Sequence, residues 1–364
     1  MAVGFPTKVS YANGDVFSAS DINDTNGTIN LLTSSTLSVA AGKNGVINGG
    51  MDIWQRGTAN VTTAYAYTAD RWQRNAVTHY GVSRQTTSDT TNLPSIQYCA
   101  RVQRTAASAS TTIVELAQSF ESVNTTPFLG KVVTISFYAR RGANYSSASN
   151  ALTCSIYTGT GTDQSVLAAY SGTVIPVTGT ATLTTTWQRF SFTGTIGSTA
   201  TELAVYFAYT PTGTAGANDY FEITGVQLEL GSVPTTFSRA GGTIQGELAA
   251  CQRYYFRATA SATFQPISLG SSASTTATYS NVQSPVTMRS TISSIDYGGT
   301  LSVFKFTSGG YHNTGTFSLG ATLLGNSGAQ IAYTHGSAVF TAGDTTMITS
   351  YTSSTAYIGM SAEL

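Results

Sequence analysis

The chain of 364 residues carries 17 Lys and Arg side chains and 17 Asp and Glu side chains, so its formal net charge is zero. Such a chain has no long-range attraction to nucleic acid or to an acidic membrane surface, and neither partner is expected. Charged residues make up only 9% of the sequence, against about 25% in ordinary soluble domains. This composition predicts a β-rich protein with a hydroxyl-covered surface, and the length predicts two domains.

Cysteine spacing and the distribution of apolar residues narrow the class further. Cys99, Cys154 and Cys251 are odd in number and widely separated, which predicts buried thiols and neither a disulfide framework nor a zinc site. No metal or cofactor motif is present, so none of these groups is expected. No apolar run reaches the roughly 18 residues of a membrane-spanning helix, and the N-terminus lacks an export signal. Lysis as part of a virus particle is one route by which such a protein leaves its cell.

Residues 1–17 have the composition of an extended arm. Gly4, Pro6 and Asn13-Gly14 separate a few large side chains, a pattern typical of terminal arms that dock onto a larger assembly. The candidate docking residues are Phe5, Tyr11 and Phe17.

Residues 18–45 carry a weak helical pattern. Ser18 or Ser20 can cap a helix whose apolar residues follow a heptad spacing. A loosely ordered linker is equally compatible, because Gly27 and many Asn and Thr residues disfavour a helix. A helix this weak needs neighbouring chains to hold it, which predicts oligomerisation. The heptad positions are Ile22, Ile29, Leu32 and Val39.

Residues 46–238 are predicted to be β-structure throughout. Period-two alternation is clear at Val133, Ile135 and Phe137 and again at Val205 and Phe207. Glycine-rich turns separate about eight or nine strand-like runs, and no helical pattern lies between them. These features predict an all-β fold of two packed sheets, most plausibly a jelly-roll β-sandwich.

Residues 219–255 form the seam between this unit and the next. The alternation changes phase at Thr224-Gly225, which predicts a β-bulge at Gly225 because one extra residue redirects every later side chain. Thr243 is a candidate cap of a short linker helix within residues 239–258. The predicted buried face of that helix comprises Ile244, Leu248, Cys251 and Tyr255.

Residues 259–364 repeat the β pattern on a smaller scale. Short strand-like runs are separated by glycine pairs such as Gly298-Gly299 and Gly309-Gly310. The segment has the size of a domain but sparse apolar runs, which predicts a smaller β-sandwich-like domain. Association with copies of itself is expected to cover its sheet edges.

Tryptophan and arginine cluster near the start of the first domain. Trp54 and Arg56 precede Asp70-Arg71-Trp72. A Trp beside an Arg can stack on a sugar or a base. The alternative, which we favour, is a framework in which Asp70 pairs with Arg56 or Arg71 while the two Trp rings cap the core.

Aromatic residues beside the C-terminal turns are candidate ligand-binding residues. Sugar recognition needs flat aromatic faces for C–H groups and amides or hydroxyls for sugar hydroxyl groups. These residues lie next to Gly298-Gly299 and Gly309-Gly310 or near the end of a predicted strand. Packing against a strand or a neighbouring chain is the alternative for each of them. The candidates are Tyr297, Tyr311, His312, Asn313, Tyr333 and His335.

No catalytic motif is present, and we predict that the protein is not an enzyme. The three histidines are isolated, and neither a GxSxG nor an HExxH sequence occurs. A glycan-cleaving protein is the enzymatic alternative, and it requires two carboxylates on either side of a sugar. Carboxylates in a chain so poor in charge more often tether loops. The available groups are Asp52, Asp70, Glu115, Glu121, Asp163, Glu202, Asp219 and Glu222.

An ordered set of motifs resembles a recurrent architecture in tail fibre and minor structural proteins of bacteriophages. The set comprises VINGGMDIWQRGT, YTADRW, KVVTISFYARR, TWQRFSFTGT, DYFEITGVQLELGSVPTTFSR, GELAACQRYY, SPVTMRS and the closing YIGMSAEL. It departs from the family pattern after Met288-Arg289, where Ser290 follows in place of the usual Pro. The resemblance implies a jelly roll similar to carbohydrate-binding modules, a distal β domain and a homotrimer. The positions it implies as framework include Trp54, Arg56, Asp70, Arg71, Trp72, Gln227, Glu229, Arg253 and Tyr254.

Together these features predict a virion fibre protein, on the tail in preference to the head. Residues 1–45 are expected to dock onto tail or capsid proteins, residues 46–238 to form the jelly roll, and residues 259–364 to present a receptor site for a host-surface glycan. The alternatives are a capsid decoration or head fibre without receptor role, and a polysaccharide depolymerase.

Overall fold

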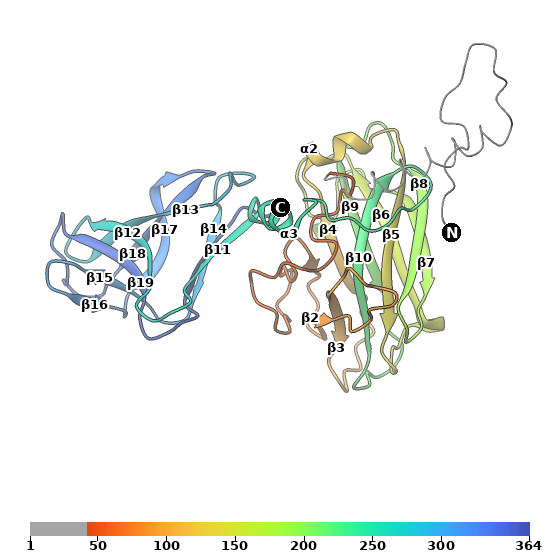
Figure 1. Cartoon of the computed structure of the whole chain (residues 1–364), viewed down its shortest axis with the longest axis horizontal. Helices are drawn as coiled ribbons and strands as arrows, with labels where there is room; N and C mark the ends of the chain where they lie inside the picture. The colour runs from red at the N-terminus through yellow and green to blue at the C-terminus, as the bar shows by residue number, and fades with distance from the viewer. Residues whose placement is uncertain (1–41) are drawn as a thin grey trace, which may run out of the picture.

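The computed structural model describes residues 42–364, apart from the side chains of residues 321–324. Two β domains lie next to each other along the long axis and are joined by a short helix (Figure 1). The predictions for the N-terminal arm and heptad segment lie outside the described residues. They concern Phe5, Tyr11, Phe17, Ile22, Ile29, Leu32 and Val39.

The first domain is a jelly roll. Its two five-stranded sheets have the orders β1-β4-β9-β6-β7 and β2-β3-β10-β5-β8. The pairs β3–β10, β4–β9, β5–β8 and β6–β7 are nested hairpins that alternate between the sheets, which is the jelly-roll connectivity. The predicted fold class is therefore confirmed. The strands are β1 Gln73–Arg74, β2 Tyr80–Thr86, β3 Tyr98–Arg104, β4 Val114–Ser119, β5 Val132–Arg141, β6 Ala151–Gly159, β7 Val174–Thr182, β8 Gln188–Thr195, β9 Glu202–Tyr209 and β10 Tyr220–Leu230.

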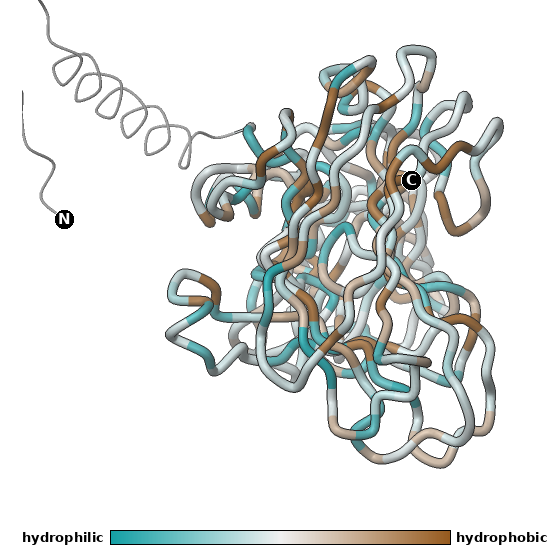
Figure 2. The backbone as a smooth tube through the Cα atoms, turned by 90° about the vertical axis from the view of Figure 1, so that its right-hand side faces the viewer, coloured by the Kyte–Doolittle hydropathy of each residue, from teal (hydrophilic) through white to brown (hydrophobic). Residues whose placement is uncertain are grey.

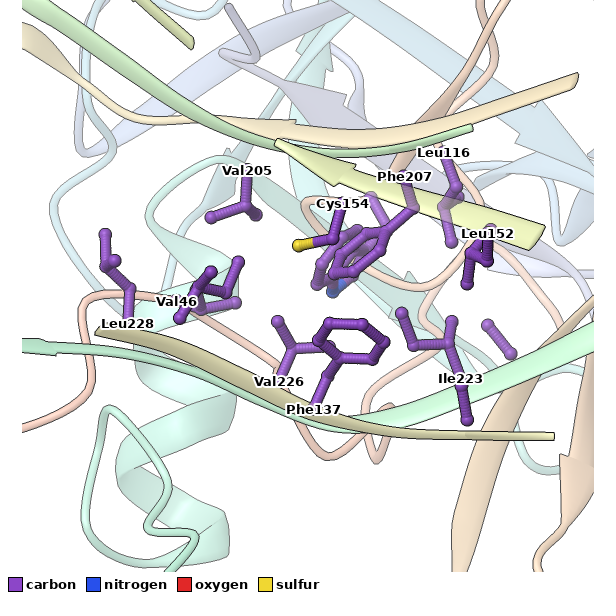
Figure 3. Packing of buried hydrophobic residues seen from close by; sticks show 14 of the residues in the cluster. Val46, Leu116, Phe137, Leu152, Cys154, Val205, Phe207, Ile223, Val226 and Leu228 are labelled. Atoms are coloured by element: carbon purple, nitrogen blue, oxygen red, sulfur yellow. The ribbon is translucent and has the colours of Figure 1, made fainter. Parts of the chain in front are cut away.

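The core of the jelly roll follows from the alternation seen in the sequence. Val133, Ile135 and Phe137 on β5 are fully buried, and the Phe137 ring contacts that of Phe207 at 4.9 Å between centroids (Figure 3). Short helical segments connect the strands at the ends of the sandwich: α2 Ser122–Thr125, η1 Thr126–Phe128, η2 Ala148–Asn150 and η3 Val166–Ala168.

The bulge predicted at Gly225 is confirmed. The register between β10 and β5 shifts between Thr224 and Gln227, and Gly225 has φ 58°. A Cβ atom at this position would lie 2.9 Å from both Ile96 and Tyr138, so both the conformation and the space favour glycine. The bulge returns Val226 to the core and places Gln227 on the outer face.

The linker helix α3 spans Ile244–Gln252. Its predicted cap is confirmed, because the Thr243 hydroxyl accepts a hydrogen bond from the Gly246 amide at 3.1 Å. The predicted apolar face is wrong at Ile244, which is 42% exposed. Glu247 is fully buried, and its carboxylate accepts hydrogen bonds from the amides of Gly241, at 2.7 Å, and Asn48.

The second domain is a smaller two-sheet structure. A three-stranded sheet, β11-β20-β14, faces a seven-stranded sheet, β16-β15-β19-β12-β13-β18-β17. Met360 and Ile358 of the small sheet share a buried cluster with Val303, Ile331 and Ile348 of the large one, as a sandwich requires. The strands are β11 Tyr255–Thr259, β12 Pro266–Ser272, β13 Ala277–Gln283, β14 Ser294–Gly298, β15 Leu301–Lys305, β16 Gly310–His312, β17 Thr316–Leu324, β18 Gly328–Thr334, β19 Thr345–Ser350 and β20 Tyr357–Ser361.

Hydropathy varies over short distances along both domains. In Figure 2 brown and teal stretches are brief and much of the tube is near white, as expected of strands with one buried face and many Ser, Thr and Gly residues. Within residues 42–364 no helix is long and apolar enough to span a bilayer.

Candidate functional site

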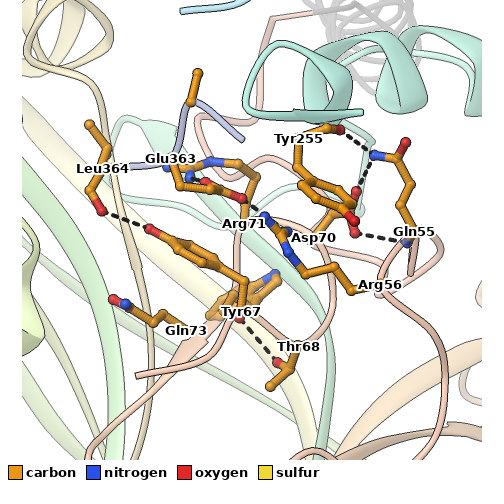
Figure 4. Close-up of polar contacts among 12 residues, drawn as sticks. Gln55, Arg56, Tyr67, Thr68, Asp70, Arg71, Gln73, Tyr255, Glu363 and Leu364 are labelled. Atoms are coloured by element: carbon orange, nitrogen blue, oxygen red, sulfur yellow. Dashed lines mark hydrogen bonds and ion pairs between the residues drawn. The ribbon is translucent and has the colours of Figure 1, made fainter. Parts of the chain in front are cut away.

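The predicted framework residues gather where the two domains meet. Arg71 is buried and forms an ion pair with Glu363, which follows the last strand, β20. The Arg71 guanidinium also donates a hydrogen bond to the Ser119 carbonyl at 2.7 Å. This guanidinium lies 3.6 Å from the centre of the Tyr254 ring. Figure 4 shows Arg71 and Glu363 at the junction together with Gln55, Arg56, Asp70 and Tyr255. We call the following set the junction cluster: Gln55, Arg56, Asp70, Arg71, Tyr254, Tyr255 and Glu363.

Asp70 does not form the predicted ion pair with Arg56 or Arg71. Arg56 pairs with Glu363 at 3.2 Å and lies 3.5 Å above the Tyr255 ring. Asp70 instead accepts hydrogen bonds from the backbone and side-chain amides of Gln55, at 2.9 and 2.5 Å. Burial raises the pKa of Asp70 above its usual range. The arginines turn to Glu363 because the second domain brings that carboxylate between them.

The tryptophans and outer β10 residues are framework as well. Trp54 and Trp72 belong to the jelly-roll core, as predicted, and their indole N–H groups donate to the carbonyls of Met51 and Asn48. Gln227 accepts from the Ser238 amide at 2.8 Å, and Glu229 accepts from the amide and hydroxyl of Thr235. These two side chains therefore hold residues 235–238 on the jelly roll.

Two further ion pairs cross the junction. Arg253 pairs with Glu121 at 3.0 Å, and Arg289 pairs with Asp163 at 2.8 Å. Burial raises the pKa of Tyr254 to about 12, so its ring is neutral at physiological pH. With its charges paired and its rings covered, the junction offers a fixed connection between domains and little surface to a ligand.

Three of the predicted ligand-binding residues support residues 312–315, at the turn after β16. Tyr333 is fully buried, and its hydroxyl donates to the His312 carbonyl at 2.8 Å and accepts from the Gly315 amide at 3.0 Å. His312 contacts the Phe340 ring at 5.0 Å. His335 hydrogen-bonds the Thr314 hydroxyl at 2.8 Å. Burial removes Tyr333 from the ligand-binding candidates, and the two histidines support the turn after β16.

The other predicted residues lie on the surface, with Tyr297 on a different sheet from Tyr311. Tyr297 is 43% exposed on β14 of the small sheet, where its ring contacts Phe317 at 5.3 Å. Asn313 is exposed in the turn after β16. Tyr311 is 38% exposed on β16, at the edge of the large sheet.

Tyr311 belongs to an aromatic group that sequence analysis missed. Its ring lies 4.8 Å from Phe304, 5.1 Å from Phe264 and 5.3 Å from Tyr351. Phe306 contacts Phe304 at 5.1 Å and is 50% exposed, and Phe264 is 47% exposed. We call Phe264, Phe304, Phe306, Tyr311 and Tyr351 the tip cluster, because β15 and β16 lie far from the jelly roll in Figure 1.

Local conformation at Phe264 is unusual. Its φ is 57°, a left-handed value that is costly for a bulky residue. The Gln265 side-chain oxygen accepts hydrogen bonds from the Ser261 amide and hydroxyl, and the Phe264 amide donates to the Tyr351 carbonyl at 3.3 Å. This strained backbone keeps an aromatic ring on the surface beside Tyr311. The Phe-Lys-Phe sequence at 304–306 is the one local signal of such a surface, because alternate residues share a strand face.

The carboxylates considered for catalysis are all engaged by neighbouring groups. Glu222 pairs with both Arg101 and Arg140, Asp219 pairs with Arg104, and the others accept hydrogen bonds from side chains or backbone amides, as loop tethers do. Their remaining partners include Arg239, Gln55, Asn75, Arg253, Arg289 and Gln164.

The described residues form neither a metal-binding group nor an exposed thiol. Across residues 42–364 no group of three or more His, Cys, Asp or Glu side chains has metal-binding geometry. The three cysteines are free and buried, as predicted, and burial raises their pKa values.

The jelly roll has a surface hollow of its own, of about 440 Å³, between residues 86 and 98. Its carboxylate, Asp89, accepts hydrogen bonds from the Thr91 and Asn92 amides at 3.0 and 2.8 Å. The Asn92 side-chain amide also donates to Asp89 at 2.8 Å, and this bond together with the one from the Asn92 backbone lowers the pKa of Asp89, so the group stabilises its own loop.

No family model and no curated protein matches the chain. Among solved structures, one described as "CBM4 structure and function" is 17% identical over 50% of this chain and 98% of its own, with a TM-score of 0.30. The carbohydrate-binding module TmCBM61 in complex with β-1,4-galactotriose is 13% identical over 52% of this chain and 99% of its own, with a TM-score of 0.31. The enzymatically active domain of bacteriophage CBA120 tailspike protein 4 is 11% identical over 52% of this chain and 21% of its own, with a TM-score of 0.30. At these values we take neither ligand nor role from them, and the jelly roll rests on the strand order.

Proposed function

We propose that the protein is a non-enzymatic fibre protein of a bacteriophage virion, and that its C-terminal domain binds a glycan on the host surface through the tip cluster. The exposed aromatic rings at the tip carry the proposal. Phe264, Phe306 and Tyr311 expose a third to a half of their surface and contact other rings. Flat, apolar faces of this kind suit the C–H side of a sugar ring.

The surroundings of the tip favour an uncharged ligand. Lys305 and Asp344 neutralise each other at 3.0 Å, and Asp344 also accepts from the Thr307 hydroxyl at 3.1 Å. A charge already paired inside the protein has little to offer an ionic ligand. Hydroxyl groups of Tyr311, Tyr351 and neighbouring threonines supply the polar contacts that sugars require.

The fibre role rests on the phage-like motif order together with the fixed junction. In this proposal residues 1–17 dock onto the virion and residues 18–45 join three copies. Three weak sugar sites that bind together gain avidity without new contacts. A rigid junction holds each tip in a defined direction, which lets the three sites engage one surface.

Binding to bacterial cells and to their isolated surface polysaccharides tests the receptor role. We expect the full chain to bind, Tyr311→Ala to lose most of the binding, and Tyr65→Ala to retain it, because Tyr65 is also exposed but lies on the jelly roll. Absence of binding to any cells tested favours a capsid decoration. Release of new reducing ends from the polysaccharide would identify a depolymerase.

Light scattering of the full chain tests the trimer. We expect three chains in each oligomer of the purified protein. An Ile29→Asp, Leu32→Asp double variant is expected to give folded monomers. A wild-type monomer under native conditions contradicts this part of the proposal and leaves the tip site untouched.

A further inference from the structure

A continuous row of apolar side chains crosses one half of the seven-stranded sheet. Direct partners on neighbouring antiparallel strands have side chains on the same face. Tyr311 on β16 pairs with Phe304 on β15, Phe304 pairs with Met347 on β19, and Met347 pairs with Leu269 on β12. Leu269 is 64% exposed, so the row faces outward, away from the small sheet.

The row continues with amides on the other half of the sheet. Ser271 on β12 pairs with Tyr279 on the antiparallel strand β13. Leu269 lies two residues before Ser271 and Asn281 two residues after Tyr279, so the side chains of Leu269 and Asn281 lie opposite each other on the same face. Asn281 is exposed and pairs with Gln330 on β18. The same outer face thus changes from aromatic to aliphatic to amide as it crosses the strands.

The amide end of the row is hollowed. A hollow of about 340 Å³ lies beside Asn281 and is lined by polar and small groups at the turn between β17 and β18. Its lining residues include Asn281, Gln283, Asn326, Ser327 and Gly328. Such groups offer hydrogen-bond donors and acceptors without charge.

None of the row residues carries a charge. Lys305 is the neighbour of Phe304 on β15, but it faces the opposite side of the sheet, where it pairs with Asp344. A ligand that lies along the row therefore meets ring faces, methylene groups and amides in turn. This order matches a chain of neutral sugars, whose units present apolar C–H faces and hydroxyl edges.

We propose that an extended, uncharged oligosaccharide lies across the strands, with one end on the tip cluster and the other in the amide hollow. This inference rests on the proposed function and names its ligand class. Neighbouring strands are about 4.8 Å apart, so the distance from β16 to β13 is about 19 Å. A sugar unit in an extended chain is comparable in length to one strand spacing, so the row accommodates about four units.

The test measures binding of the full chain to gluco-, galacto-, manno- and N-acetylglucosamine oligosaccharides of two to eight units, by titration calorimetry. We expect the affinity for the preferred series to rise with length up to about four units and then level off. Asn281→Ala is expected to weaken binding of the longer oligosaccharides about tenfold and to leave disaccharide binding unchanged. Asn218→Ala, which removes an exposed amide on the jelly roll, is the matched control, and thermal melts confirm that each variant folds.

Each outcome distinguishes the two claims. Affinity that does not depend on length, or an Asn281→Ala variant that binds long oligosaccharides normally, overturns the extended site and leaves the tip site standing. Absence of binding in every series overturns both. Tighter binding of carboxylated or sulfated oligosaccharides overturns the uncharged ligand class. Self-association that Leu269→Ser abolishes, with sugar binding unchanged, assigns the row to a second copy of the chain and overturns the inference.

Discussion

At the junction the rings of Tyr254 and Tyr255 lie against the guanidinium groups of Arg71 and Arg56, whereas at the tip the ring of Tyr311 contacts other rings. The junction rings are nearly fully buried, and the tip rings are substantially exposed. Both regions are aromatic, but only at the junction do the rings lie against the paired arginines. At the junction the rings beside arginines are therefore buried framework, whereas at the tip the rings contact one another and several of them stay exposed.

Substitutions in the two regions should also have different effects. Removing one member of a buried ion pair leaves an uncompensated charge, which is among the most destabilising of single changes. Removing an exposed ring forfeits little burial and changes mainly what the surface can bind. Substitutions at the junction are therefore expected to lower stability, and substitutions at the tip to lower affinity.

The largest effect is expected for Glu363→Ala. The Arg71 and Glu363 side chains are 2% and 7% exposed, so the variant leaves Arg71 buried without its carboxylate, at a cost of about 3–5 kcal/mol in the free energy of unfolding. Urea denaturation measures the change. The matched control is Asp296→Asn, which removes a pair whose carboxylate is 46% exposed and should cost at most about 1 kcal/mol. Equal effects of the two variants would contradict the distinction between buried and exposed pairs.

A smaller effect is expected for Tyr254→Leu. The change keeps an apolar side chain under Arg71 but removes the aromatic face, with a loss of about 2 kcal/mol for a desolvated cation–π contact. Tyr254→Phe is the control, because it removes the hydroxyl and keeps the ring face against the Arg71 guanidinium. Equal free energies of unfolding for the Phe and Leu variants would show that the aromatic face does not contribute to stability.

At the tip, Phe304→Ala is expected to weaken glycan binding about tenfold, which corresponds to about 1.4 kcal/mol. Its ring is the centre of the cluster, in contact with both Phe306 and Tyr311. Calorimetric titration with the preferred oligosaccharide measures the affinity. Leu230→Ala, a change at an exposed apolar residue of the jelly roll, should leave the affinity unchanged.

The smallest effect is a pH dependence of the second domain. Burial lowers the pKa of His312, and the neighbouring His335 and Lys305 lower it further. The folded domain therefore favours the neutral ring, and its stability is expected to fall as the pH drops from about 6.5, the unfolded value. Thermal melts between pH 7.5 and 5 measure this slope. His312→Phe keeps a ring against Phe340 and should flatten the slope, so a slope that is unchanged in this variant would assign it to other groups.

Much of the fold was predictable because its rules are local. The alternation of Val133, Ile135 and Phe137 predicts a strand with one buried face, and the phase change at Gly225 predicts the bulge. Thr243 predicts the helix cap in the same way, since capping depends on a few adjacent residues. The burial of Glu247 in place of Ile244 was not predictable, because the Asn48 amide that bonds Glu247 lies far away in the sequence.

The candidate site was predictable only in part. Tyr311 stands beside a glycine turn, and this local feature was enough to select it. Its partners Phe264 and Tyr351 come from separate loops and meet it only through the pairing of β16, β15 and β19. Tyr333 has the same local context as a surface tyrosine, yet the outer strands and the Phe340 loop bury it.

By itself the sequence determined the all-β class, the jelly roll, the bulge and the linker helix, because composition and periodicity act over a few neighbouring residues. Only the tertiary structure decided that Glu363, and not Asp70, pairs with Arg56 and Arg71, and that rings from distant segments form the tip cluster. Ion pairs and ring contacts depend on distance in space, and folding brings together groups that are far apart in the sequence.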